Sequence, residues 1–483
     1  MAADTVRSVT TAEKTEGELE LDRLFKLQQD AFAQNPYPSY EERIENLDKI
    51  LRIVDTYEDK FIEAINADFN GRSKFVTVIA EITGMIGSVK HAKKHLRKWM
   101  KPRAVPTPIH MAPAKSRLMP QPLGVVGCIA PWNYPLLLAV APAISALAAG
   151  NRVLMKPSEL TPNLSAVLKE AVAHEFEEET LAVITGGVDT GQAFTNKPFD
   201  HIIFTGSTQI GALVAQAAAK NLTPVTLELG GKSPAIIDKT AELEKAAISI
   251  AHGKMLNAGQ TCIAPDYILT DAVRVQHVAD AIKAAALSLF PEIDTTADYT
   301  SIISDRHFAR LKALVENARE AGAEIIEVGS AQALHPQRKM PLTLVLNPPA
   351  HTHIMKEEIF GPVLPILSVE GTQGAIDHVN AHERPLALYW FGENDEARDN
   401  VLKRTVAGGV TINDTLWHFA QENLPFGGVG KSGMGANHGA AGFDAFSHMK
   451  PVFYQSRFVN GGLLYPPYTE KTGKLLSFIR KIL

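Results

Sequence analysis

Cysteine is scarce in this chain of 483 residues, with only Cys128 and Cys262. A single pair cannot form the disulfide framework that holds small secreted domains together. The segment Met1–Asp22 carries acidic side chains and no apolar core, unlike a secretory signal, so we expect a disordered lead-in there. Both features predict a protein of a reducing compartment, the cytoplasm.

A long uninterrupted hydrophobic run is also absent. The most apolar stretch, 123–150, contains Pro131, Asn133, Pro135 and Pro142, which break a membrane-spanning helix. We expect a buried strand, a turn and a buried helix there. The basic, amphipathic tail 474–483 is too short to span a membrane, and we expect it to dock on a partner subunit.

Charge of one sign does not dominate. The chain has 48 Lys and Arg residues and 53 Asp and Glu residues, which gives a formal net charge of −5. Such a mild balance argues against nucleic acid as the main partner and favours small molecules. The 16 histidines include the close pair His351 and His353, but no carboxylate or cysteine set completes a ligand shell around them. We therefore expect no metal site.

The length predicts two or three domains, and the apolar pattern predicts an α/β fold. Residues 24–99 have helical periodicity, and the proline-rich stretch 102–122 predicts a linker or an extended hairpin. Beyond it, apolar runs with β-branched residues alternate with helical stretches, which is typical of a parallel sheet. The expected strands are 125–129, 153–155, 181–184 and 202–204, with helices at 137–149, 162–176 and 208–219. A second such series runs from Glu228 to about residue 430.

Glu228 and Cys262 together form the pair needed to make and hydrolyse a thioester. A thiolate is a good nucleophile for a carbonyl carbon, and a nearby carboxylate can activate water against the acyl group that the sulfur then carries. We expect local electrostatics or a base to supply the thiolate. Cys128 lies in an apolar strand with no acid or base nearby, so it is interpreted as a core residue.

The surrounding sequence indicates the roles of Glu228 and of Asn133. Glu228 lies in an apolar run, where burial should raise the pKa of its carboxyl group towards neutrality. Asn133 lies between two prolines, and its amide is a candidate oxyanion donor beside the Cys262 backbone N–H.

Two strand ends are candidates for a nucleotide site. The segment 204–211, Phe-Thr-Gly-Ser-Thr-Gln-Ile-Gly, follows a strand and opens a helix, where free N–H groups favour a pyrophosphate, although by spacing alone a plain glycine turn is an equal alternative. Lys156 and Glu159 follow another strand and are placed to bind ribose hydroxyls. The Glu159 carboxylate would repel a 2′-phosphate, so NAD is expected over NADP.

Six segments in this order resemble the aldehyde dehydrogenase superfamily: 131–135, 156–159, 204–208, 227–234, 257–262 and 357–362. The stretch 424–435, with His438 and Phe446–His448, is similar to the class 3 branch, and most to bacterial coniferyl aldehyde dehydrogenases. The resemblance implies a variant Rossmann cofactor domain (20–104 and 123–229), a catalytic thiol domain (230–435) and an oligomerisation arm with a tail (105–122 and 450–483). It also implies a homodimer.

The same resemblance implies further site residues. It places Gly206, Ser207 and Gly211 at the cofactor, Glu358 on the nicotinamide ribose and Phe360 near the nicotinamide ring. Trp132 and Leu229 complete the expected cofactor site, and the class 3 branch is one whose members often accept NADP as well as NAD. The substrate pocket is expected to include Tyr134, Leu137, Leu138, Trp417 and Phe426.

The implied reaction is the oxidation of an apolar aldehyde to its acid. The aldehyde is expected to be aromatic, an aryl-propenal such as coniferaldehyde, or a medium- to long-chain aliphatic aldehyde. One alternative within the enzyme class is an acylating dehydrogenase that transfers the acyl group to coenzyme A, although a hydrolytic base would then be wasted. An esterase without redox function leaves the nucleotide site without a purpose. A catalytically silent scaffold is a third alternative, although Cys262, Glu228 and Asn133 are all retained.

Overall fold

The computed structural model describes residues 14–293, 295–329, 337–457 and 464–482. A six-stranded sheet in the order β15-β7-β6-β3-β4-β5 forms the first α/β unit. Its strands are β3 (Val125–Ile129), β4 (Arg152–Lys156), β5 (Leu181–Val183), β6 (His201–Gly206), β7 (Val225–Leu229) and β15 (Gly433–Met434). All pairings are parallel except that of β15 with β7. Strands buried on both faces need continuous apolar runs, which is the pattern seen in β3.

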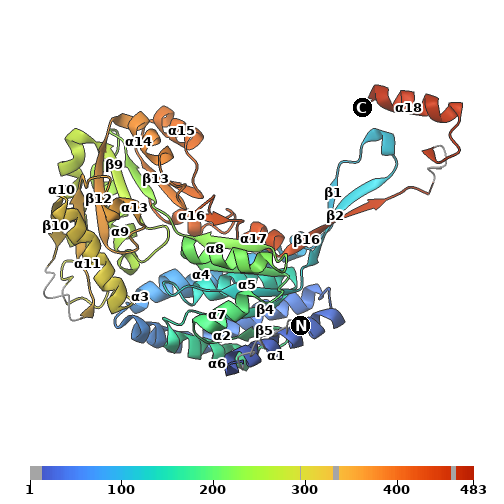
Figure 1. Ribbon diagram of the computed structural model, residues 1–483, viewed down its shortest axis with the longest axis horizontal. Coiled ribbons are helices and arrows are strands. Elements are labelled where there is room, and N and C mark those ends of the chain that lie inside the picture. The colour runs from blue at the N-terminus through green and yellow to red at the C-terminus, as the bar shows by residue number, and fades with distance from the viewer. Residues whose placement is uncertain (1–13, 294, 330–336, 458–463, 483) are drawn as a thin grey trace, which may run out of the picture.

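Helices cover both faces of this sheet (Figure 1). One core joins the sheet to α2 (Tyr40–Phe69), α4 (Thr83–Trp99), α5 (Leu137–Ala149), α6 (Pro162–Glu175) and α17 (Gly439–Ala445). The other joins it to α1 (Glu16–Gln34), α7 (Val188–Thr195) and α8 (Thr208–Ala219). Between α2 and α4 lie the short helix α3 (Lys74–Thr77) and a π-helical turn, η1 (Val78–Ile82).

The second α/β unit has a seven-stranded sheet in the order β10-β11-β12-β9-β8-β13-β14. Only the pairing of β10 with β11 is antiparallel. The strands are β8 (Pro234–Ile237), β9 (Tyr267–Asp271), β10 (Glu324–Val328), β11 (Leu342–Leu346), β12 (Val363–Val369), β13 (Ala387–Phe391) and β14 (Gly409–Ile412). The helical elements are α9 (Leu243–Met255), η3 (Leu256–Gly259), η4 (Ala272–Arg274), α10 (Val275–Leu289), α11 (Asp305–Glu320), α13 (His353–Lys356), α14 (Gly371–Asn380), α15 (Asp395–Arg404) and α16 (Trp417–Ala420). A single large core unites them.

A three-stranded antiparallel sheet extends from the body as an arm (Figure 1). It contains β1 (Arg103–Val105), β2 (Lys115–Pro122) and β16 (Ser447–Tyr454), with the short helix η2 (Ile109–Met111) at the turn between β1 and β2. The C-terminal helix α18 (Glu470–Ile482) lies near the end of the arm. The hairpin expected from the proline-rich stretch is therefore present, with β16 paired along β2.

Two expectations need correction. The lead-in expected over residues 1–22 is helical from Glu16, because Thr15 and Glu18 form a capping box that satisfies free N–H groups of α1. Residues 1–13 lie outside the described residues. In addition, β15 joins the first sheet, although 230–435 was assigned as a whole to the catalytic domain. A strand of two residues has no alternating pattern to reveal it.

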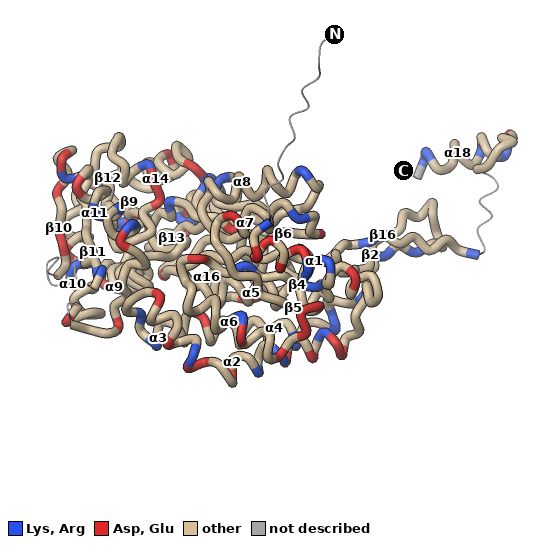
Figure 2. Tube along the Cα trace, turned by 60° about the horizontal axis from the view of Figure 1, so that its bottom comes forward, with Lys and Arg blue, Asp and Glu red and all other residues tan. Residues whose placement is uncertain are grey.

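Acidic and basic residues are interspersed along α2 and its neighbours (Figure 2). Among the described residues, no helix combines the length and the apolar composition needed to cross a membrane.

Candidate active site

Cys262 follows an unusual turn at the end of α9. Asn257, Ala258 and Gly259 have φ values of 52°, 53° and 70°, three left-handed residues in succession. A side chain at Gly259 would be excluded, since its Cβ would lie 2.5 Å from the Gly361 carbonyl oxygen. The turn thus brings the Cys262 loop against the segment 357–362, and Cys262 itself is half-buried.

Glu228 reaches this loop from the other unit, near the end of β7. It pairs in register with Thr205 on β6 and Gly433 on β15, and it is 7% exposed. Neither carboxylate oxygen has a hydrogen-bond partner among the described residues. Burial raises the pKa of the Glu228 carboxyl group to about 8, as its apolar surroundings predict.

The Cys262 thiol is held in its protonated form by the protein alone. Burial raises its pKa to about 12, and the nearby Glu358 and Glu228 carboxylates raise it further by repulsion. Within the polypeptide, local electrostatics therefore oppose the thiolate, and a base is the other source expected from the sequence. Cys128 is buried in β3, and burial raises its pKa as well, which confirms a core role.

Asn133 is fixed to the Cys262 loop by hydrogen bonds between backbone and side-chain groups. Its side-chain amide donates to the Gln260 carbonyl at 3.1 Å, while its own carbonyl accepts from the Asn257 amide at 2.9 Å. The Tyr134 hydroxyl and Thr261 hydroxyl lie 2.7 Å apart. Because a carboxamide carries two N–H groups, one remains beyond the bond to Gln260 for a ligand.

The predicted nucleotide turn lies between β6 and α8. Gly206 ends β6, and the Ser207 hydroxyl caps α8 by accepting from the Ile210 N–H. Gly211 packs against Leu229 so closely that a Cβ would lie 2.5 Å from a Leu229 methyl carbon. The helix therefore starts close to the sheet, with N–H groups free for a phosphate.

Lys156 and Glu159, the pair expected to bind a ribose, lie at and just after the carboxyl end of β4, where open α/β sheets bind ligands. Lys156 Nζ is 3.5 Å from the Glu159 carboxylate, whose side chain is 49% exposed. Three exposed apolar side chains flank the turn, Val188 on α7 with Ile210 and Leu213 on α8. Sequence reasoning missed them, because only the folded chain shows that these side chains are exposed.

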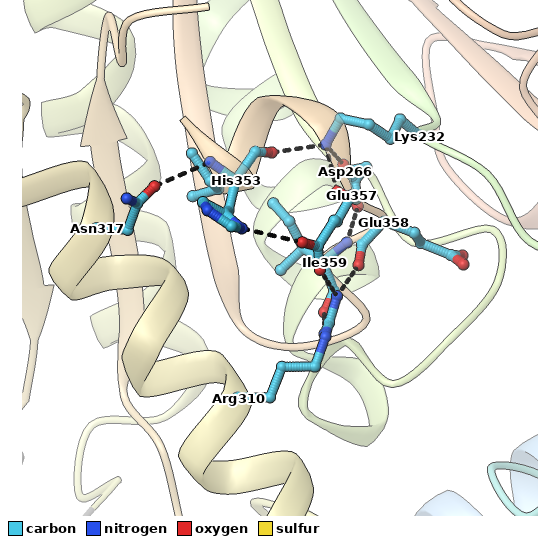
Figure 3. A network of polar contacts seen from close by, with 9 residues as sticks. Lys232, Asp266, Arg310, Asn317, His353, Glu357, Glu358 and Ile359 are labelled. Atoms are coloured by element: carbon cyan, nitrogen blue, oxygen red, sulfur yellow. Dashed lines mark hydrogen bonds and ion pairs between the residues drawn. The ribbon is translucent and has the colours of Figure 1, made fainter. Parts of the chain in front are cut away.

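Glu358 lies in a segment held by a polar network (Figure 3). Lys232 Nζ donates to the Ile354 and Glu357 carbonyls at 2.8 and 3.0 Å and pairs with Asp266. From α11, Arg310 donates to the Ile359 carbonyl at 2.8 Å and to the Glu358 carbonyl at 2.5 Å. The backbone that carries Glu358 is therefore fixed on two sides.

The Glu358 side chain points towards the turn after β7. A Cβ on Gly230 would lie 2.2 Å from a Glu358 carboxylate oxygen, so this close approach needs glycine. Burial, followed by the nearby Asp266 charge, raises the Glu358 pKa to about 8. Phe360, with φ of 52°, places its ring 5.3 Å from that of Trp132, which itself lies 5.0 Å from His307.

The expected substrate-pocket residues occupy two regions. Tyr134 and Leu137 are buried and Leu138 is half-buried at the start of α5, whereas Trp417 on α16 is 65% exposed. Phe426 is buried and stacks between His418 and His438, at centroid distances of 6.0 and 5.4 Å. Over the described residues, no cluster of His, Cys, Asp and Glu could hold a metal ion.

Comparison with known proteins places this site in a family. The model of the aldehyde dehydrogenase family matches residues 4–452, so the chain belongs to the aldehyde dehydrogenase family. It is an NAD(P)-dependent oxidoreductase that oxidises aldehydes to acids. Within the family it is similar to the probable coniferyl aldehyde dehydrogenase of Caulobacter vibrioides, with 45% identity over 95% of this chain and 96% of that one. It is also similar to the mouse aldehyde dehydrogenase family 3 member A2, with 40% identity over 89% and 87% of the two chains.

Solved structures confirm the expected fold. The substrate-bound AldH of Staphylococcus aureus has a TM-score of 0.90 at 38% identity, covering 95% of this chain and 99% of that one. An aldehyde dehydrogenase of Mycobacterium tuberculosis in complex with NAD⁺ has a TM-score of 0.81 at 27% identity, covering 92% and 91%. The resemblance inferred from the six segments is thus confirmed, including its coniferyl aldehyde branch.

Proposed function

We propose that this chain oxidises an apolar aldehyde with NAD through a thioester on Cys262 that Glu228 helps to hydrolyse. The proposal rests on the surroundings of Glu228. Its buried carboxylate has no hydrogen-bond partner in the described residues, and it is close enough to raise the pKa of the Cys262 thiol. Such a group is costly to bury, and a base that activates water against an acyl sulfur explains its presence.

Attack on the aldehyde requires the thiolate of Cys262. When bound, NAD supplies a hydride acceptor and a positively charged ring, which opposes the two carboxylates that raise the thiol pKa. The thiol then loses its proton to solvent, and Sγ forms a bond to the carbonyl carbon. The free N–H of the Asn133 amide and the Cys262 backbone N–H stabilise the resulting alkoxide.

Collapse of the alkoxide transfers a hydride, for which bound NAD would be the acceptor, and leaves a thioester on Cys262. Glu228 then takes a proton from water as the water oxygen bonds to the acyl carbon, and the C–S bond breaks to release the acid. One aldehyde, one NAD⁺ and one water give acid, NADH and a proton. Glu228 is buried and has no hydrogen-bond partner among the described residues, and its pKa of about 8 suits a base for this step.

The cofactor site fits a dinucleotide. Gly206 and Gly211 leave the start of α8 open to a pyrophosphate, Lys156 and Glu159 would bind ribose hydroxyls, and the exposed apolar side chains of α7 and α8 would cover the base. Glu358 would hold the second ribose, and Phe360 and Trp132 the ring. The Glu159 carboxylate would repel the 2′-phosphate of NADP, so NAD is the preferred cofactor.

The substrate is proposed to be an aryl-propenal such as coniferaldehyde. Tyr134, Leu137, Leu138, Trp417 and Phe426 supply aromatic and leucine surface, and a relative at 45% identity is named for coniferyl aldehyde. The alternative is an aliphatic aldehyde of medium or long chain. Pocket contacts of this kind discriminate by about 1–3 kcal/mol per group.

A substrate panel tests this proposal. NADH formation at 340 nm is measured with NAD or NADP and coniferaldehyde, benzaldehyde, hexanal or decanal. We expect kcat/KM for coniferaldehyde to exceed that for hexanal by about tenfold or more, with NAD preferred. A preference for decanal would favour the aliphatic alternative, and NADH formed only with added coenzyme A would favour acyl transfer.

The hydrolysis step should depend on pH through Glu228. Its carboxyl group must be ionised to act as a base, and its pKa is raised to about 8, so hydrolysis should quicken as the pH rises through that value. The measurement forms the acyl-enzyme at low pH, then jumps the pH and follows loss of the acyl group. A rate that stays flat from about pH 6 to pH 10 would contradict the assignment of Glu228.

The arm and tail are proposed to form a homodimer contact. Ile109, Phe453 and Tyr454 on the arm and Phe478 on α18 are exposed apolar residues. The proposed division into a cofactor domain (20–104 and 123–229), a catalytic domain (230–435, without β15) and an arm with a tail (105–122 and 450–483) leaves this surface for a second copy.

A further inference from the structure

A buried ion pair lies behind the loop that carries Asn133. Arg72 Nη2 is 3.0 Å from Glu81 Oε1, and both side chains are 0% exposed. The Arg72 guanidinium lies between the rings of Phe69 and Tyr134, 5.1 and 5.0 Å from their centres. Burying two charges is costly and pairing them often brings no net stability, so a stabilising role alone explains this pair poorly.

Both members of the pair hold the Asn133 loop directly. Arg72 Nη1 donates to the Asn133 carbonyl at 3.0 Å. Glu81 accepts from the Leu136 and Leu137 N–H groups at 2.7 and 3.0 Å, at the N-terminus of α5, where no side chain of the helix provides a cap. The loop is thus held at Asn133 and at the point where it enters α5.

The geometry at Asn133 transmits this restraint to the site. The Asn133 carbonyl accepts from both Arg72 and Asn257, so the backbone cannot rotate without breaking two bonds. The side-chain amide, bonded to the Gln260 carbonyl at 3.1 Å, then has a single direction for its second N–H. That direction decides where an alkoxide formed on Cys262 can be stabilised.

The helix itself is distorted at Glu81. The residue lies in the π-helical turn η1, between the α-helical segments α3 and α4. Such turns are rare and cluster at functional sites. The carboxylate therefore reaches the N-terminus of α5 from the only π-helical turn in the described part of the chain.

We propose that the Arg72–Glu81 pair is a positioning unit for the oxyanion donor Asn133 and thereby sets the rate of attack on the aldehyde. The pair touches neither the thiol nor the substrate and acts through Asn133. The inference rests on the proposed role of Asn133, and the test separates the two.

The test is a pre-steady-state burst of NADH in four single variants and two double variants, all made in the Glu228→Gln background, where slow hydrolysis lets the first turnover be counted. Arg72→Met and the neutral pair Arg72→Met/Glu81→Gln remove the restraint, and the second also avoids leaving one charge buried alone. Asn133→Ala removes the donor, and Asn133→Ala/Arg72→Met completes a double-mutant cycle. Arg72→Lys is the conservative variant. Arg43→Met is the matched control, because Arg43 is 2% exposed and bonds carbonyls at the far end of α5.

The burst amplitude counts active sites, and the burst rate constant reports the chemistry of each site. We expect Arg72→Met and the neutral pair to lower the rate constant about 10- to 100-fold, with an amplitude that matches the folded protein and with NAD binding unchanged. Arg72→Lys should recover part of the rate. In the Asn133→Ala background, Arg72→Met should have no further effect on the rate constant. Arg43→Met should lower the amplitude at most.

Three results would overturn the inference. A reduced amplitude with an unchanged rate constant in the Arg72 variants would show a structural role alone. An equal slowing by Arg72→Met with and without Asn133 would show that the pair acts by another route. An unchanged rate constant in Asn133→Ala would refute Asn133 as the oxyanion donor. The proposed function would then fail at this residue, and the inference that rests on it would fail with it. The Arg72 single variants alone cannot reveal this failure.

Discussion

Replacing Cys262 by alanine is expected to abolish NADH formation with every aldehyde, by roughly 10⁴-fold or more. Removing a covalent nucleophile leaves only binding and the oxyanion donors, and the one other cysteine of the sequence, Cys128, is buried in β3. NAD binding should be retained, because the proposed cofactor contacts come from β4, the start of α8 and the segment 357–362. The measurement is kcat by absorbance at 340 nm beside a fluorescence titration with NAD.

Cys128→Ala is the matched control for this variant. Cys128 is 1% exposed within β3, so its loss should cost some stability and leave kcat unchanged. Activity that survives in Cys262→Ala and disappears in Cys128→Ala would refute the assignment of the nucleophile.

Replacing Glu228 by glutamine should leave the first turnover intact and stop the second. Glutamine keeps the shape of the side chain but cannot take a proton from water, so steady-state turnover should fall by about 10²- to 10⁴-fold. The burst of NADH should persist, since the change removes one of the carboxylates that raise the Cys262 pKa. Stopped-flow absorbance separates the burst from the steady state.

Hydroxylamine offers a control for the glutamine variant. It attacks a thioester without a general base and should restore turnover, with a hydroxamate as product in place of the acid. Loss of the burst together with the steady state would show that Glu228 also acts before hydride transfer, and failure of the rescue would show that no thioester accumulates.

Much of the fold could be predicted from the sequence because parallel strands buried on both faces are continuous apolar runs. The runs at 125–129 and 202–204 appear as β3 and half of β6, and the helices expected at 137–149 and 208–219 match α5 and α8. Glu228 was identifiable because a charge inside an apolar run needs an explanation. Its burial and raised pKa follow the same reasoning.

Other features depend on contacts that sequence patterns do not contain. Left-handed backbone at Ala258 accompanies the close packing of its neighbour Gly259 against the Gly361 carbonyl, and alanine does not signal such a conformation. The two-residue strand β15 exists only because it pairs with β7. The raised pKa of Cys262 comes first from burial in the folded chain and then from Glu358, which is 96 residues further along the chain by their numbering.

Glu81 could be predicted in part: its burial follows from the sequence, but its contacts do not. It lies in the run Val78-Ile-Ala-Glu-Ile82, an acid among apolar residues, and the reasoning that identified Glu228 applies to it equally. Its partner Arg72 is local in sequence, but their shared target, the Asn133 loop, lies some 50 to 60 residues away and only the folded chain reveals it.

The central claim is that the aldehyde is oxidised while bound covalently to Cys262 and that water then releases it with the help of Glu228. Intact-protein mass spectrometry of Glu228→Gln, quenched after mixing with NAD and coniferaldehyde, tests it most directly. The account predicts an adduct on Cys262 with the mass of the aldehyde less two hydrogens, the thioester, and no adduct in Cys262→Ala. An unmodified protein despite a burst of NADH, or an adduct of the same mass in Cys262→Ala, would contradict it.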